Sequence, residues 1–110
     1  EVNMDALRIM EQAILETVGK VHLHPPIHTP GGEDFHHYAM HHPKLKATML
    51  GLGCGLTPGL HHPQMTFNTE RLVTGVEILV RTVISALQSV KNEGAEDYVR
   101  VSNSERIDYN

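Results

Sequence analysis

The chain has 110 residues, 40% of them hydrophobic and 20% charged, which predicts one folded domain with a modest core and excludes a disordered chain. A net charge of −4 at pH 7 predicts neither a nucleic-acid partner nor binding to an anionic membrane surface. The single cysteine, Cys54, excludes an intramolecular disulfide and indicates a reducing, cytoplasmic location. The longest apolar run, residues 47–56, is too short to span a bilayer, so no membrane partner is expected.

Residues 4–18 predict an amphipathic helix. Asn3 or Asp5 is placed to cap its start, and Gly19 suits its end. Its apolar stripe is formed by Leu7, Met10, Ile14 and Val18. A stripe of this kind needs a sheet or another helix to cover it.

Two further segments predict strands, and a third predicts a long helix. Residues 20–24 alternate apolar and polar side chains, while residues 45–53 form an apolar run that leaves through a glycine-rich loop. Residues 69–92, capped by Asn68, carry a broad apolar stripe. We therefore predict an α/β fold, with a partial mixed sheet covered by the two amphipathic helices.

The last part of the chain is polar. The helical periodicity fades after Lys91, and residues 98–101 are the one candidate for a further strand. We predict a domain over residues 1–94 and a loosely held polar tail over residues 95–110.

Glycines and histidines mark the candidate segments for binding a ligand or a metal ion. Gly31-Gly32 permits close approach of a ligand to the backbone, and Glu33 and Asp34 follow where they can cap a short helix or turn over residues 34–42. The nine histidines cluster between residues 22 and 62. Within residues 36–42, four histidines include pairs four and five positions apart, which suits a metal pair, although solvated or subunit-contact side chains are the favoured interpretation.

Three motifs occur in an order that resembles a known family. They are GGEDF (31–35), ATMLGLG (47–53) and PGLHHPQMTFN (58–68). Together they resemble the end of the catalytic domain in two-metal metallopeptidases of the aminoacylase, hippurate hydrolase and auxin-conjugate amidohydrolase type. The resemblance covers residues 4 to about 90 and implies a part of a larger hydrolase-like catalytic domain.

The resemblance implies a metal-dependent amidohydrolase that cleaves an N-acyl or aminoacyl amide bond with a metal-activated water. Two divalent ions, zinc or manganese, are the implied cofactors, because a bound metal lowers the pKa of water and polarises a carbonyl. By its place before the final helix, His61 matches the last metal ligand of the family. His62 and the loop residues Gly31, Gly32, Glu33 and Asp34 match the lining of the substrate pocket.

The chain also departs from that family. The histidine, aspartate and glutamate set that supplies the other ligands and the general base has no counterpart here, so no catalytic residue is assigned. One ligand does not hold a catalytic metal. We therefore expect an inactive piece of a larger enzyme, whose partners are the remainder of its own polypeptide, a small acyl-amino-acid or peptide substrate, and further copies in a homo-oligomer. The alternatives are a non-catalytic, histidine-rich module for metal binding or assembly, and a purely structural module.

Overall fold

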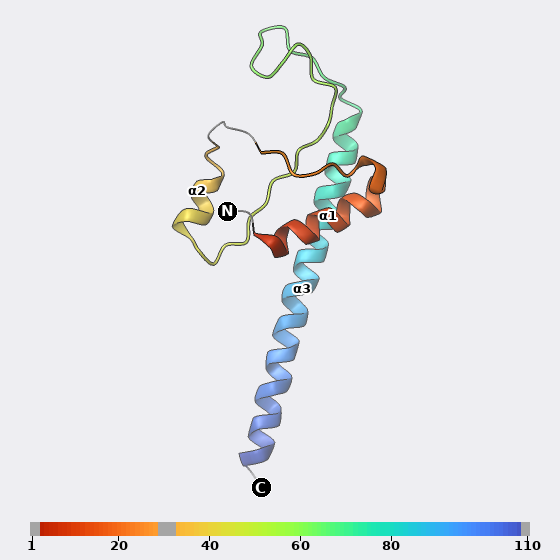
Figure 1. Cartoon of the computed structure of the whole chain (residues 1–110). Coiled ribbons are helices and arrows are strands. Elements are labelled where there is room, and N and C mark those ends of the chain that lie inside the picture. Colours follow the sequence, from red (N-terminus) through yellow and green to blue (C-terminus); the bar gives the residue numbers. More distant parts are fainter. Residues whose placement is uncertain (1–2, 29–32, 109–110) are drawn as a thin grey trace.

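The computed structural model in Figure 1 describes residues 3–28 and 33–108, with side chains described as far as Gly94. Its elements are the helix α1 (Met4–Val18), the 3-10 turn η1 (Lys20–His22), the short helix α2 (His36–His41) and the long helix α3 (Arg71–Asp108). The radius of gyration is 19.4 Å, whereas a compact domain of this length has about 13 Å. The molecule is therefore elongated.

The first helix forms where the sequence predicts it, for local reasons. The Asn3 side chain accepts a hydrogen bond from the backbone N–H of Ala6 at 3.0 Å, which satisfies one free donor of the first turn. At the other end, Gly19 has φ +82° and its N–H donates to the carbonyl of Leu15 at 3.0 Å. Asn3 is thus the cap, and the predicted helix over residues 4–18 is confirmed.

The long helix also begins close to its predicted start. The Asn68 side chain accepts from the N–H of Glu70 at 3.1 Å, and the Asn68 carbonyl accepts from the N–H of Arg71 at 3.3 Å. The helix then continues to Asp108, so the strand considered for residues 98–101 is wrong. The division between a domain and a tail at residue 94 stays a prediction.

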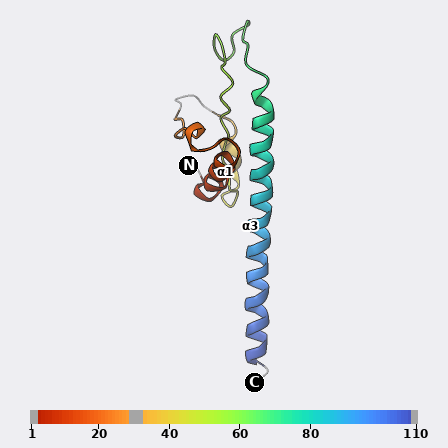
Figure 2. The same ribbon diagram turned by 90° about the vertical axis from the view of Figure 1, so that its right-hand side faces the viewer.

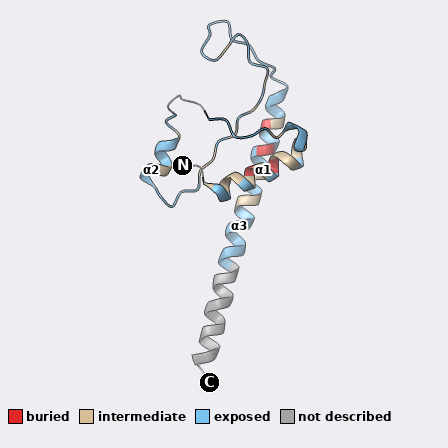
Figure 3. Cartoon of the chain, in the orientation of Figure 1, coloured by how far each residue is buried: buried red, intermediate tan, exposed pale blue. Residues whose placement is uncertain are grey.

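The buried core lies where α1 crosses α3. Met10 and Ala13 of α1 and Ile78 of α3 are the buried hydrophobic side chains among those described, with 7%, 2% and 3% of their surface exposed. Figure 3 shows the buried residues confined to this crossing, and Figure 2 shows α1 beside one part of α3 while the rest of α3 extends past it. The core is therefore small, and Ala13 is its most buried side chain.

An arginine joins the two helices at the edge of this core. Arg81 of α3 lies 3.7 Å from the Glu16 carboxylate of α1 and 3.2 Å from Glu77, one turn earlier on α3. All three side chains are substantially exposed, so the pairs contribute little stability beyond fixing how the helices meet.

The predicted α/β fold with a partial mixed sheet is wrong. Over the described ranges the structure is helical and contains no strand, only a single antiparallel bridge between Thr57 and Thr66. Residues 20–24 begin in the turn η1, because the N–H groups of His22 and Leu23 donate to the carbonyls of Gly19 and Lys20, each at 3.2 Å. Those local bonds replace a ladder to another strand.

The segment over residues 45–53 keeps the side-chain alternation of a strand without its hydrogen bonds. Thr48, Leu50 and Leu52 are half-buried, whereas the residues between them are exposed. Within the parts of the chain that are described, no backbone hydrogen bond joins residues 46–53 to another segment. Apolar alternation predicts which side chains face a neighbour, but a strand also needs a second backbone beside it.

One stretch of α3, Arg71–Gly94, is long and apolar enough to cross a membrane when only length and composition are considered. It also contains Glu77 and Arg81, and Arg81 pairs with Glu16 of α1. Charged side chains inside a bilayer are costly, so this composition also suits a helix packed against protein. The absence of a membrane partner stays a prediction.

Candidate functional site

The loop that contains His61 is closed at its base by backbone hydrogen bonds. The N–H of Thr57 donates to the carbonyl of Thr66 at 3.0 Å, and the N–H of Thr66 donates back at 2.8 Å. Just below, the N–H of Asn68 donates to the carbonyl of Cys54 at 2.8 Å. Residues 57–66 thus form a projecting loop, seen at one end of the molecule in Figures 1 and 2.

The two histidines of this loop have different local roles. His61 adopts a left-handed conformation with φ +65°, which is uncommon for any residue other than glycine. The His62 ring is partly used by the turn itself, since its Nδ1 accepts from the N–H of Gln64 at 3.1 Å. Both side chains are exposed. The loop therefore presents the His61 imidazole to the outside while His62 helps to shape the turn.

The acidic loop before α2 is described only in part. Gly31 and Gly32, predicted to line a substrate pocket, lie outside the described residues. Glu33 and Asp34 are exposed, and their carbonyls accept from the N–H groups of His36 and His37 at 3.3 and 3.0 Å. The prediction that their side chains cap this helix is wrong, because Phe35 is the first flanking residue and makes no side-chain cap.

Among the described residues, the structure does not bring the loop of His61 together with Glu33 and Asp34, which precede α2. The loop of His61 and the helix α2 lie apart in both views (Figures 1 and 2). Among the described residues no group of three or more histidine, cysteine, aspartate or glutamate side chains is placed to hold a metal ion. His61 alone does not fit a divalent metal, so no catalytic step through a metal follows from these residues. The assignments of His61, His62, Glu33 and Asp34 stay predictions.

One ion pair between distant segments of the chain has no counterpart in the predictions from the sequence. The Lys46 ammonium donates to the Asp5 carboxylate at 3.0 Å and joins the extended segment to the start of α1. This hydrogen bond, with the charge of Lys46, lowers the pKa of Asp5 below 3.8, and the same contact raises the pKa of Lys46 above 10.5. No local sequence pattern marks such a pair, because the two residues are 41 positions apart.

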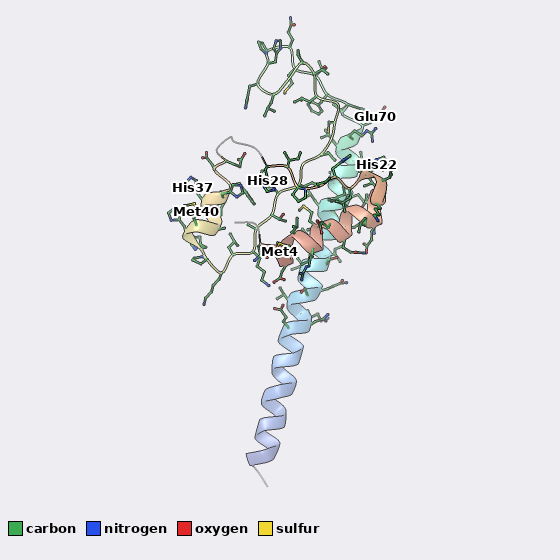
Figure 4. All side chains as sticks on the ribbon, viewed as in Figure 1. Met4, His22, His28, His37, Met40 and Glu70 are labelled. Carbon is green, nitrogen blue, oxygen red and sulfur yellow. The ribbon has the colours of Figure 1, made fainter. Side chains whose placement is uncertain are left out.

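The surface of α2 carries a shallow hollow with histidines on one side. It has a volume of about 630 Å³ and is lined by Asp34, Phe35, His37, Tyr38, His41 and His42. The Phe35 ring contacts Tyr38 edge-on, with ring centres 6.0 Å apart. Figure 4 labels His37 and Met40 on this helix, away from the loop of His61.

The closed loop with the exposed His61 precedes α3, and the exposed acidic residues Glu33 and Asp34 lie earlier in the chain. Residues 1–85 match the model of Peptidase family M20/M25/M40. That match covers well over half of the chain, and the chain belongs to this family. No curated protein and no solved structure matches it.

Membership confirms the coarse part of the resemblance seen in the sequence. The family consists of metal-dependent peptidases and amidohydrolases, and its members generally bind divalent metal ions. The chain is therefore related to hydrolases that act with a metal.

Proposed function

We propose that this chain is part of an amidohydrolase of the aminoacylase type, which hydrolyses an N-acyl or aminoacyl amide bond with a metal-activated water. The observation that carries the proposal is His61 on a closed loop before α3, within a chain that belongs to the peptidase family. The backbone bonds at the base of the loop hold its ends together, which supports a role in presenting one imidazole in a defined place.

His61 would supply one ligand to a pair of zinc or manganese ions, and Glu33, Asp34 and His62 would line the substrate pocket. The remaining ligands and the general base would come from elsewhere in the same polypeptide or from a further copy. An association with further protein is supported by the exposed apolar side chains of α3, because contiguous exposed apolar surface marks sites of protein–protein contact. A cytoplasmic location is supported by the single free cysteine.

The test is the His61→Gln variant of the full-length protein, measured for bound zinc and manganese and for hydrolysis of N-acyl amino acids. Loss of a residue that only supports a ligand already weakens metal binding by about 10- to 100-fold, so loss of a ligand is expected to weaken it by more than about 100-fold. Activity is expected to fall with the metal content.

The matched control is His24→Gln, which removes an exposed histidine outside the closed loop. It is expected to keep both metal and activity. A His61→Gln protein with normal metal content and normal hydrolysis would remove His61 from the site and the proposal with it.

A further inference from the structure

Two histidines on α2 stand out from the other histidines of the chain. His37 and His41 are four positions apart, so they lie on the same side of the helix, one turn from each other. Their ring centres are 6.2 Å apart, and the ring planes differ by 22°. The other histidines nearby lack this relation, because Met40 follows His36 by four positions and Tyr38 precedes His42 by four.

The hollow beside this pair also contains a carboxylate and a further imidazole. His37 and His41 line the hollow on α2 together with Asp34 and His42. All four side chains are exposed, so a bound ion would keep water in its open positions and the imidazoles would lose little hydration. Asp34 precedes α2 and adds a carboxylate to the lining of the hollow.

Two imidazoles on adjacent helical turns form a chelate. Once one nitrogen binds an ion, the second is held nearby at a high effective concentration, so the pair binds more tightly than two separate histidines. Imidazole ligands suit zinc, copper and nickel, whereas magnesium and calcium prefer oxygen ligands. The chemistry of the pair therefore selects a borderline transition metal.

We propose that His37 and His41 form a second metal site, which takes a transition-metal ion of the zinc or copper class. Water molecules complete the coordination, because among the described residues no third such side chain is placed to join the pair. The site is independent of the proposed function, because it lies on α2 and shares no residue with the loop of His61. Binding also joins two turns of α2 and so stabilises a helix that has only six residues.

The experiment titrates the chain of 110 residues with Zn²⁺ alone in a calorimeter and compares four single variants with it. His37→Gln and His41→Gln each remove one ligand of the chelate. Each is expected to weaken the tightest zinc binding by at least about tenfold, a threshold set below the roughly 10²- to 10⁴-fold gain that linked binding can provide. Circular dichroism without metal checks that both variants keep the helix content of the parent chain.

The matched controls are His36→Gln, on the same helix without a histidine four positions away, and His22→Gln, an exposed histidine of the turn η1. Both are expected to bind zinc as the parent does. Cu²⁺ added in small amounts is expected to broaden the imidazole NMR signals of His37 and His41 before those of the other histidines.

The proposal fails if His37→Gln and His41→Gln bind zinc as tightly as the parent chain, or if His36→Gln weakens binding equally. It fails also if His22→Gln abolishes the tightest binding and the α2 variants do not. A failure of the His61 test described above leaves this site unaffected, so the two results remain distinguishable.

Discussion

The residue with the most informative backbone is His61. A left-handed conformation costs a side chain with a Cβ atom about 1–2 kcal/mol, and glycine avoids that cost. The bonds between Thr57 and Thr66 hold the ends of the loop and help to impose this conformation. An uncommon backbone at an exposed histidine supports a functional hypothesis, because nothing in local packing requires the imidazole there.

A His61→Gly variant separates the imidazole from the shape of the loop. Because glycine adopts φ +65° freely, we expect the loop to be retained or stabilised by up to about 1 kcal/mol, although the ligand is gone. Hydrogen exchange at the amides of Thr57 and Thr66 measures the stability of the closed loop. Faster exchange at both amides would show that the imidazole itself holds the loop. His62→Gly is the contrasting control, since it removes the acceptor for the N–H of Gln64 and should speed exchange there.

The tie between Asp5 and Lys46 predicts a defined pH dependence. The lowered pKa of Asp5 means that its contribution to folding is present above pH 3.8 and is lost as the pH falls through the lowered value. The raised pKa of Lys46 means that its contribution is present below pH 10.5 and is lost as the pH rises through the raised value. Both groups are therefore charged at pH values between the pKa of Asp5 and the pKa of Lys46. The effect of this ion pair on global stability is small because both groups are exposed.

An NMR titration of the Asp5 carboxyl group checks this. Its midpoint is expected below 3.8 in the parent chain and closer to 3.8 in a Lys46→Gln variant. Arg8→Gln is the comparison, since Arg8 is the smallest of the causes that lower the Asp5 pKa and should change the midpoint less. Equal midpoints in the parent and Lys46→Gln would mean that the pair does not form in solution.

Among the elements, the contact between Leu52 and α3 decides where the extended segment lies. Gly75 is buried, and a Cβ atom added there would come within 2.8 Å of a terminal methyl carbon of Leu52. Glycine within a helix is otherwise unfavourable by about 1 kcal/mol relative to alanine. The absence of a side chain at position 75 thus lets the extended segment approach the helix.

Gly75→Ala and Gly94→Ala form a matched pair on the same helix. Nothing lies within 4 Å of a Cβ atom at Gly94, so that variant is expected to gain helix stability of about 0.5–1 kcal/mol. Gly75→Ala is expected to gain less, because Leu52 must move, and a Leu52→Ala background should remove the difference. Thermal unfolding followed by circular dichroism measures both. Equal gains in the parent background would show that Leu52 does not contact Gly75.

At the scale of the whole molecule, the main feature is an apolar face of α3 that no other described segment covers. It points away from the crossing with α1, and its six central side chains are each more than half exposed. They recur at alternating spacings of three and four, which is the pattern of a helix that packs against another helix. These residues, the seam of α3, are Val73, Val76, Val80, Val83, Leu87 and Val90.

We expect the isolated chain to associate with a second copy through the seam of α3. Sedimentation analysis should then give a mass above the 12.3 kDa of one chain. Val80→Lys places a charge in the seam, and an unpaired buried charge costs about 3–5 kcal/mol, so association should be lost at micromolar concentration. Met40→Lys, at an exposed position on α2, is the control and should still associate. A parent chain that is a monomer and binds no apolar dye would contradict this.

The sequence by itself determined the elements that depend on near neighbours. Helix α1 and the start of α3 follow from apolar spacing and from Asn3 and Asn68, whose side chains bond to N–H groups two or three residues away. The short helix α2, which has no side-chain cap, lies in a local run that ends before Pro43. The family could also be predicted from the sequence, because three motifs in the right order resemble it.

Tertiary structure alone decided the rest. A strand at residues 45–53 requires a second backbone beside it, and apolar alternation does not specify one, so the predicted sheet was wrong. The ion pair of Asp5 with Lys46 and the contact of Leu52 with Gly75 join distant segments without any local signal. For the same reason, the type and spacing of His61, Glu33 and Asp34 predict a site, whereas their positions in space decide what they can bind, and among the described residues no group of three such side chains is placed to hold a metal ion.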